Sequence, residues 1–381
     1  MKQSLPKRVM GKSGVEVFPL GFGCMRLPRT EDGKTDQERS VRMLCDAVDQ
    51  GITYFDTAFG YLGGRSESIV GKALKNLKRD DITLATKLPI WHECSREYAD
   101  RTLATQLERL GTDHIDFYLL HGQSKDVFAK AREEGILEWL DEQVKAGKIR
   151  YPSFSFHDDH ATFVNIIDSY DWYMAQVQMN YLDINNQATM EGVAYAGKKG
   201  VTLIAMEPLL GGALANNVPE EVTAAIDAFP VKRSPVEWAF RFLLDRPEFS
   251  VLLSGMSTEE QVAQNLETFS KPSQPGCMSA EEHALIDQLR TIYENRKRIG
   301  CTNCRYCMPC PSGVRIPDIF ERLNEGYRFN DIPGPLSWFH EELKKENQDA
   351  SQCTACGACE GVCPQKLPII ETLKEVVRML A

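Results

Sequence analysis

Eight short apolar segments, each followed by a stretch in which apolar residues recur at helical spacing, limit the folds open to this chain. Alternating strands and helices pair in parallel through right-handed crossovers, and eight such repeats favour a closed barrel over an open sheet. The sequence therefore predicts an α/β fold of the (β/α)8 TIM-barrel type. We expect its strands at residues 18–23, 53–58, 82–87, 114–121, 149–156, 174–180, 201–206 and 249–254.

The segments between these strands carry helix signals. Residues 35–38, Thr-Asp-Gln-Glu, form a capping box, and the apolar stripe that follows stops at Gly51. No Gly-x-Gly-x-x-Gly motif opens the first unit, which argues against an open dinucleotide-binding sheet. Before the barrel, residues 8–17 fit a short hairpin. Further helices are expected at residues 66–78, 95–110, 131–146, 158–169, 187–199, 234–244 and 258–269.

The length of 381 residues accommodates one large domain of roughly 250 residues and a smaller one. Residues 271–276, Lys-Pro-Ser-Gln-Pro-Gly, are rich in helix breakers and mark the expected boundary. We therefore expect a barrel at residues 1–270, a linker and connecting helix at 271–298, and a small, mostly α-helical cysteine domain at 299–381.

Charge and hydropathy exclude several classes of partner. The formal net charge is -10, and Lys and Arg form no basic block, which argues against non-specific nucleic-acid binding. The amino terminus lacks the apolar stretch of a signal peptide, and no later apolar run approaches the ~18 residues of a membrane span. We expect a cytoplasmic protein that binds neither nucleic acid nor membrane.

Eight of the twelve cysteines fall in two runs near the carboxyl terminus, a pattern typical of metal binding in a long chain. Each run ends in Cys-Pro, and the domain resembles a bacterial two-cluster ferredoxin, in which the fourth cysteine of each run binds the other [4Fe-4S] cluster. Four-cysteine zinc sites are the alternative, because zinc accepts the same ligands. The predicted ligand sets are Cys301, Cys304, Cys307 and Cys363 for one cluster, and Cys353, Cys356, Cys359 and Cys310 for the second.

Four titratable residues fall at or just beyond the ends of adjacent predicted strands: Asp56, Tyr61, Lys87 and His121. Barrel chemistry gathers at this carboxyl-terminal rim. A tyrosine, with an ordinary pKa near ~10, can donate a proton to a carbonyl if a cation such as Lys87 lowers that pKa. Asp56 would keep Lys87 charged, and His121 could hydrogen-bond the carbonyl oxygen. Taken singly, each residue also fits a rim ion pair or a core histidine.

Residues 5 to 270 resemble the aldo-keto reductase family, whose catalytic tetrad is Asp, Tyr, Lys and His at these strand ends. The matching stretches are 55–61, 85–87 and 119–121. The fused cysteine domain resembles the iron-sulfur branch of that family. The resemblance implies a barrel, a nicotinamide cofactor, and reversible reduction of a small carbonyl substrate to an alcohol without a catalytic metal.

The resemblance also implies cofactor contacts, although three positions depart from the family pattern. Phe156 replaces an asparagine, Met206 replaces an aromatic ring that stacks on the nicotinamide, and Gln261 replaces an arginine. Because residues 254–265 offer no basic partner for a 2′-phosphate, we expect NADH to be favoured over NADPH. The positions at which the resemblance implies cofactor contacts, with two of the replaced residues among them, are Gly23, Ser155, Gln178, Met206, Leu209, Gly211, Ser254, Gly255, Ser257, Gln261 and Asn265.

The two predicted halves handle electrons differently. A nicotinamide passes a hydride, whereas a [4Fe-4S] cluster passes one electron, and coupling them normally needs a flavin, for which the sequence carries no signature. Three roles of the clusters stay open: they feed the barrel through a flavin, relay electrons to a partner such as ferredoxin, or are structural. Our hypothesis is an oxidoreductase with Tyr61 as general acid and base, whose clusters relay electrons. The alternative is a non-catalytic electron-carrier or regulatory subunit whose barrel only binds nucleotide.

Overall fold

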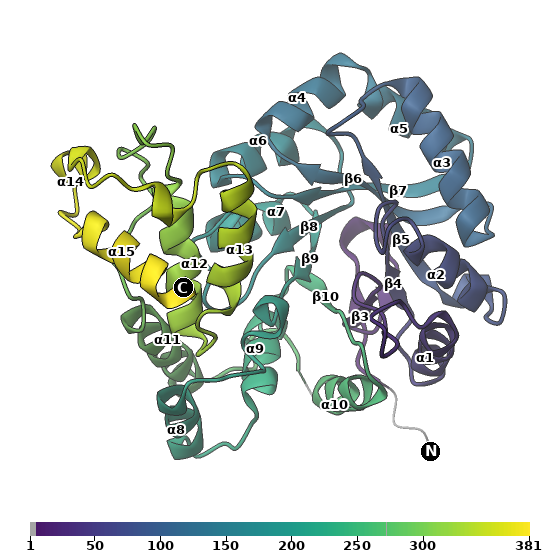
Figure 1. Cartoon of the computed structure of the whole chain (residues 1–381). Coiled ribbons are helices and arrows are strands. Elements are labelled where there is room, and N and C mark those ends of the chain that lie inside the picture. The colour runs from purple at the N-terminus through teal and green to yellow at the C-terminus, as the bar shows by residue number, and fades with distance from the viewer. Residues whose placement is uncertain (1–4, 272) are drawn as a thin grey trace. The chain divides into compact units, whose positions relative to one another are not determined.

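A computed structural model describes residues 5–271 and 273–381 (Figure 1). Contacts divide the chain into two compact units. The first unit consists of Met1–Leu210 and Ala239–Ser279, and the second unit consists of Gly211–Trp238 and Ala280–Ala381. The boundaries that we expected near residues 270 and 298 stay predictions. Residues 1–4 and Pro272 of the predicted linker lie outside the described residues. Within the described part of the chain, no helix has the length and apolarity needed to cross a membrane.

The first unit contains a closed parallel barrel in which each strand pairs with its sequence neighbours and the last strand pairs with the first (Figure 1). This confirms the predicted TIM barrel. The strands begin and end within a few residues of the predicted positions. They are β3 (Leu20–Gly23), β4 (Tyr54–Asp56), β5 (Thr83–Pro89), β6 (Ile115–Gln123), β7 (Ile149–Phe156), β8 (Met174–Gln178), β9 (Thr202–Met206) and β10 (Phe249–Ser254).

The barrel interior is filled by side chains from alternate strand positions. Gly21 needs to be glycine, because a Cβ there would lie 2.7 Å from the Val251 side chain and 2.8 Å from that of Leu253. The predicted hairpin is present as β1 (Arg8–Val9) and β2 (Glu16–Val17), with η1 (Gly11–Ser13) between them. Met10 and Val17 belong to the same buried cluster as the barrel side chains, so the hairpin helps to close the interior.

Helices surround the barrel, and several begin at capping side chains, as at Asp36 and Ser95. The single helix expected at 131–146 is wrong, because Gly135 at φ 68° separates two helices. The helices of this layer are α1 (Gln37–Asp49), α2 (Ser66–Leu74), α3 (Arg96–Leu110), α4 (Lys125–Glu133), α5 (Ile136–Lys145), α6 (His160–Ser169), α7 (Thr189–Lys198), α9 (Pro235–Leu244) and α10 (Glu259–Ser270), with the short turns η2 (Arg79–Asp81) and η3 (Leu210–Gly212).

The second unit is helical, as expected for the cysteine domain. Its buried core includes Ile316, Phe320 and Leu373, and three cysteines of each run pack against that core. The sequence did not predict α8 (Glu220–Ala228), which packs on α11 (Ala280–Asn295), with Arg296 donating to both carboxylate oxygens of Glu221 at 2.9 Å. The remaining elements are α12 (Ile316–Arg328), α13 (Gly334–Lys345), η4 (Ala350–Gln352), α14 (Ala358–Val362) and α15 (Ile369–Leu380).

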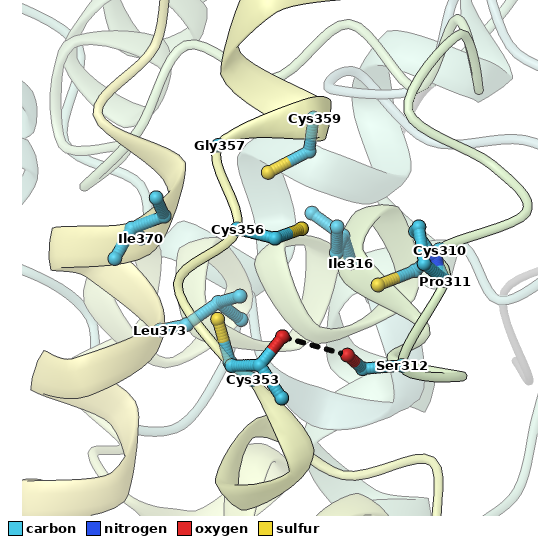
Figure 2. A pocket seen from close by; sticks show the side chains of 11 residues that line it. Cys310, Pro311, Ser312, Ile316, Cys353, Cys356, Gly357, Cys359, Ile370 and Leu373 are labelled. Atoms are coloured by element: carbon cyan, nitrogen blue, oxygen red, sulfur yellow. Dashed lines mark hydrogen bonds between the residues drawn. The ribbon is translucent and has the colours of Figure 1, made fainter.

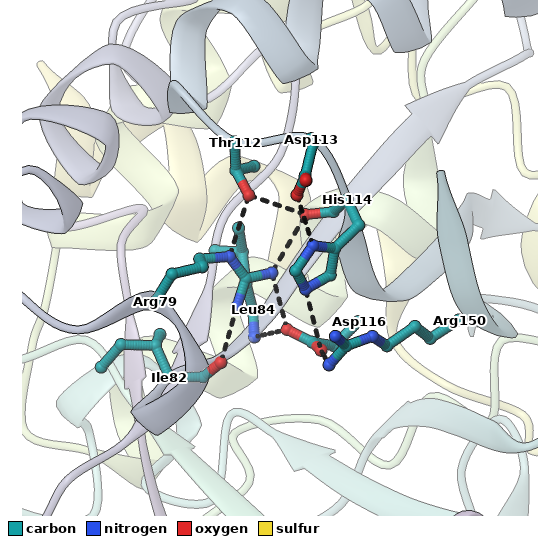
Figure 3. Close-up of polar contacts among 8 residues, drawn as sticks. All are labelled: Arg79, Ile82, Leu84, Thr112, Asp113, His114, Asp116 and Arg150. Carbon is teal, nitrogen blue, oxygen red and sulfur yellow. Dashed lines mark hydrogen bonds and ion pairs between the residues drawn. The ribbon is translucent and has the colours of Figure 1, made fainter. Parts of the chain in front are cut away.

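A buried carboxylate ties together three barrel strands near their amino-terminal ends (Figure 3). Asp116 of β6 accepts hydrogen bonds from Arg79 at 2.8 Å, from the Leu84 backbone N–H at 2.9 Å and from Arg150 at 2.8 Å. The Asp116 side chain is only 6% exposed, so loss of its charge would leave two guanidinium groups and a buried N–H poorly satisfied.

We expect Asp116→Asn to lower the free energy of unfolding by about 2–4 kcal/mol, because one buried acceptor loses its charge beside two cations. Urea unfolding followed by circular dichroism measures this change. Asp113→Asn is the matched control, since that side chain is 94% exposed in the turn just before β6, and it should unfold like the wild type. Equal stability of the two variants would contradict the assignment.

Candidate active site and cysteine sites

The four predicted tetrad residues lie together at the carboxyl-terminal rim of the barrel. Lys87 of β5 donates from Nζ to Asp56 Oδ1 at 2.5 Å, to the Thr57 carbonyl at 2.8 Å and to the Tyr61 hydroxyl at 3.3 Å. The Tyr61 and His121 rings meet edge to face with centroids 5.9 Å apart. Parallel strands in register bring these residues together, since Asp56 pairs with Ala85 of β5 and Lys87 with Leu119 of β6.

Lys87 is fully buried, so its charge depends on its partners. Burial lowers the pKa of its ammonium, but the Asp56 carboxylate and the Tyr61 hydroxyl more than offset this effect, and the net pKa is raised. The ammonium therefore stays charged over the physiological range. A fixed cation next to a phenol can stabilise the tyrosinate that forms when Tyr61 gives up its proton.

Tyr61 differs in one respect from our expectation. Burial raises the pKa of its phenol, and the nearby charge of Lys87 offsets that rise only in part, so the net pKa lies above the ordinary value. Lys87 thus brings the pKa of Tyr61 below the value that burial alone would give, but not below the ordinary value in water. The consequence is that Tyr61 stays protonated near neutral pH, which is the form a proton donor needs.

His121 is held as a neutral imidazole. Burial first, and then the positive charge of Lys87, lower its pKa to about 3. The ring of Trp91 packs on that of His121 with centroids 4.9 Å apart, and Trp91 itself is 43% exposed. Trp91 therefore forms an aromatic wall beside the catalytic candidates, open to solvent on its other side.

Gln176 was missed by the sequence analysis. It lies on β8, is fully buried, and donates from Nε2 to Asp56 Oδ2 at 2.8 Å, so both carboxylate oxygens are held. It pairs in register with Ser155 of β7. Its own Oε1 has no hydrogen-bond partner within the described ranges. Strand alternation could have found Gln176, because it lies two positions before Gln178 and so faces the same side of the strand.

Gln178, the predicted carboxamide ligand, has both ends of its amide engaged in the loop after β8. It donates to Asp183 at 3.2 Å and accepts from Gln187 at 2.8 Å. Ser155 is buried, and its hydroxyl accepts from the Gly122 N–H at 2.7 Å. These contacts place Ser155 and Gln176 next to the tetrad and tie Gln178 to the rim above them.

Two of the departures from the family pattern have a clear structural position. Phe156 packs on Phe163 of α6 with ring centroids 5.1 Å apart, so its ring lies in the helix layer and cannot act in place of an asparagine at the rim. Met206 ends β9 and packs, partly buried, against the barrel interior cluster. Leu209 and Gly211 follow it in the turn after β9, where Gly211 adopts φ 64°.

The remaining predicted cofactor residues lie at the ends of β3 and β10. A Cβ at Gly23 would lie 3.4 Å from the Ser254 carbonyl oxygen, and the Gly255 position is covered by the side chain of Arg26 at similar distances. Asn265 donates to the Ser254 hydroxyl at 3.0 Å. Ser257 donates its N–H to Gln261 Oε1 at 2.7 Å, so Gln261 folds back over the loop.

The eight clustered cysteines line two cavities in the second unit. Ile316 lines both cavities. Each cavity takes three cysteines from one run and the last cysteine of the other, which is the partition that the sequence pattern predicts. The first cysteine site contains Cys301, Cys304, Cys307 and Cys363, and the second cysteine site contains Cys353, Cys356, Cys359 and Cys310 (Figure 2).

Comparison with known proteins agrees with this geometry. The model of the aldo/keto reductase family matches residues 19–290. This chain belongs to the aldo/keto reductase family. A 4Fe-4S dicluster domain matches residues 300–367, so the chain is an aldo-keto reductase-like oxidoreductase with an iron-sulfur domain.

Individual relatives match the barrel portion. The uncharacterized oxidoreductase YqkF of Bacillus subtilis (strain 168) is 27% identical over 288 residues, which cover 68% of this chain and 90% of the relative. The aldo-keto reductase YhdN of the same organism is 31% identical over 224 residues, 55% of this chain and 64% of the relative. The solved holo form of aldo-keto reductase AKR11C1 from Bacillus halodurans is 28% identical, with a TM-score of 0.64 over 75% of this chain and 96% of that chain.

The neutral state of His121 predicts a pH dependence of stability. The unfolded chain protonates this histidine near its ordinary pKa of about 6.5, whereas the folded protein resists protonation until about pH 3. The contribution of neutral His121 to the free energy of unfolding is thus fully present above about pH 6.5. It is lost as the pH falls towards 3, by up to about 1.4 kcal/mol per pH unit.

We expect His121→Gln to lose less stability than the wild type between pH 7 and pH 5, as measured by urea unfolding at both values. Other groups contribute alike to both proteins and cancel in the difference. His92→Gln, at an exposed histidine in the loop after β5, should keep the wild-type pH dependence. A His121→Gln variant with that same dependence would show that His121 is not held neutral.

Proposed function

We propose that the protein catalyses the NAD(P)H-linked reduction of a small carbonyl substrate, and the reverse oxidation of the alcohol, with Tyr61 as general acid and base. The observation that carries this proposal is the hydrogen-bonded set of Asp56, Lys87 and Tyr61 with neutral His121 beside it. We further propose that two [4Fe-4S] clusters transfer electrons to or from the protein.

The residues next to the tetrad fit a nicotinamide. The buried Gln176 Oε1, which has no partner among the described residues, can accept a hydrogen bond from a carboxamide N–H, and the Ser155 hydroxyl lies on the paired strand. Met206 offers a thioether to the ring face. When bound, the nicotinamide supplies the hydride that the carbonyl carbon receives.

The protein side chains would then manage the proton. Tyr61 donates its phenolic proton to the carbonyl oxygen in reduction and takes it back in oxidation. Lys87 stabilises the tyrosinate, and Asp56 keeps Lys87 charged and in place through the 2.5 Å contact. His121, as a neutral imidazole, can donate a hydrogen bond to the same oxygen without adding a second charge beside Lys87.

Each cysteine site would hold one cluster, which supplies one-electron transfer when present. Two clusters could take up two electrons one at a time, and we propose that they exchange them with a partner protein such as ferredoxin. A bridging flavin has no signature in the sequence. A reducing compartment such as the cytoplasm would keep the cysteines available as ligands.

The proton role is tested by Tyr61→Phe, which removes the hydroxyl and keeps the ring. We expect the rate of NADH- or NADPH-dependent reduction, measured on a panel of small aldehydes and ketones, to fall by about 10²–10⁴-fold, because the proton donor is lost. Tyr195→Phe is the control, since that hydroxyl contacts Asp168 on the outer helices.

Two outcomes would contradict the assignment. Undiminished reduction by Tyr61→Phe would remove the general-acid role. Nucleotide binding without any reduction by the wild type would instead favour a non-catalytic subunit whose barrel only binds nucleotide.

The cluster assignment predicts paired effects of single cysteine changes. Anaerobically purified protein should contain about eight iron atoms per chain, and Cys363→Ser or Cys310→Ser should each reduce this to about four. Electron paramagnetic resonance should show that the two variants retain different clusters, since each cysteine lines a different site. Cys277→Ser, outside both runs, should keep the full content. Stoichiometric zinc in place of iron would contradict the assignment.

A further inference from the structure

The contact between the Lys87 ammonium and the Tyr61 hydroxyl joins two separate segments of the first unit. Lys87 lies on β5, whereas Tyr61 lies in the turn between β4 and α2. At 3.3 Å, this contact is the longest of the three hydrogen bonds that the Lys87 ammonium makes. Proton transfer by Tyr61 therefore requires other groups that hold the turn against β5.

Glu67 is a buried carboxylate that the mechanism above does not use. It is the second residue of α2 and is fully buried. Its Oε1 accepts from the Thr86 hydroxyl at 2.7 Å and from the Gln106 amide at 2.8 Å, and its Oε2 accepts from Arg109 at 3.1 Å. Burying a carboxylate is costly unless it is paired and hydrogen-bonded, so these three partners account for its presence there.

Two of these contacts lead to Lys87. Thr86 is the residue before Lys87 on β5, and neighbouring strand positions face opposite sides, so Thr86 faces away from the side that Lys87 faces. The Gln106 amide also donates to the Lys87 carbonyl oxygen at 3.0 Å. Gln106 is itself held by the Tyr118 hydroxyl, which donates to its Oε1 at 2.7 Å. Glu67 therefore fixes the backbone of β5 at Lys87.

Other contacts lead to the turn that holds Tyr61. Ser66, the residue before Glu67, donates its backbone N–H to the Tyr61 carbonyl oxygen at 3.2 Å. Arg109 Nη1, which contacts Glu67, also donates to the Phe59 carbonyl oxygen at 3.3 Å. The Arg109 guanidinium lies over the Phe59 ring, 4.5 Å from its centroid. The turn is thus held two residues before Tyr61 and at the carbonyl of Tyr61 itself.

Close packing of α2 on α3 brings the partners of Glu67 within reach (Figure 1). A Cβ at Gly71 of α2 would lie only 2.2 Å from the Arg109 carbonyl oxygen of α3. Because α2 has glycine at this position, α3 approaches closely enough for Gln106 and Arg109 to contact the carboxylate. One polar network therefore joins α2, α3 and β5.

We propose that Glu67 is a positioning residue that holds Tyr61 at hydrogen-bond distance from Lys87. It acts through the two segments that carry these residues, and not through a contact with substrate. Proton transfer is sensitive to small displacements of the donor, so a turn released from this network would slow the reaction. The inference rests on the proposed function, because it assigns Glu67 a part in the proton transfer by Tyr61.

The geometric claim is tested by nuclear magnetic resonance on full-length, cluster-loaded protein whose tyrosines carry ¹³C at Cζ. The Tyr61 resonance is the one missing from Tyr61→Phe, and it reports on the surroundings of the phenol. We expect Glu67→Gln to shift this resonance, because an amide keeps the size of the side chain but accepts hydrogen bonds at only one end. Arg109→Gln should also shift it, and it replaces Glu67→Gln if that variant does not fold.

Two controls separate positioning from a general loss of stability. Glu97→Gln makes the same change at the second residue of α3, where the side chain is exposed. Asp116→Asn removes a buried charge near the amino-terminal ends of the strands, so it should destabilise the fold without reaching the turn. Neither control should shift the Tyr61 resonance.

The functional claim is tested by a double-mutant cycle. We expect Glu67→Gln to lower kcat for carbonyl reduction by about 10- to 100-fold and to leave the dissociation constant of the nucleotide unchanged. In a Tyr61→Phe background the same change should cause little further loss, because the hydroxyl that Glu67 positions is already absent. Glu97→Gln should keep the wild-type kcat.

An unshifted Tyr61 resonance in both Glu67→Gln and Arg109→Gln would overturn the inference. So would a loss of kcat in Glu67→Gln that recurs in full in the Tyr61→Phe background, since that loss would not act through Tyr61. Undiminished reduction by Tyr61→Phe, or no reduction by the wild type, would instead contradict the proposed function. The Tyr61 resonance would still decide in that case whether Glu67 positions the phenol.

Discussion

A fully buried ammonium at the barrel rim is the feature on which the rest of the site depends. Lys87 has no access to water, so its charge exists only because Asp56, the Thr57 carbonyl and the Tyr61 hydroxyl receive its three hydrogen bonds. Gln176 holds the other oxygen of Asp56 from across the barrel. Removing any one of these groups would leave an uncompensated charge or donor, which explains how a network drawn from three strands keeps a single geometry.

Burial separates the behaviour of the two neighbours of this cation, because it raises the pKa of a phenol and lowers that of an imidazole, whereas Lys87 lowers both. Burial keeps the proton on Tyr61, while burial and the charge of Lys87 keep one off His121. One group is therefore ready to give a proton and the other is an uncharged hydrogen-bond donor at the same pH. The barrel achieves this by excluding water around the buried Lys87–Asp56 ion pair.

The sequence predicted what depends on local pattern. Strand and helix alternation identified the barrel, and strand ends identified the positions of Asp56, Lys87 and His121. It missed Gln176, which strand alternation places on the same face as Gln178, because its contact with Asp56 joins residues 120 positions apart in the sequence. It also missed the break at Gly135, where one apolar stripe continues across two helices, and it could not foresee that burial outweighs Lys87 in setting the pKa of Tyr61. These effects arise from packing between distant segments, which periodicity does not report.

Each cysteine site of the second unit takes three cysteines from one run and its fourth from the other run. Cys310 completes the site built by the later run and Cys363 completes the site built by the earlier one. The second cysteine site is complete only when the chain has been synthesised as far as Cys359, and the first only at Cys363. Both sites also need the segment that contains α12 and α13 to fold back so that the two runs meet. Metal would thus be inserted late, after both runs have been synthesised. Each inserted group would then cross-link two segments that are distant along the chain.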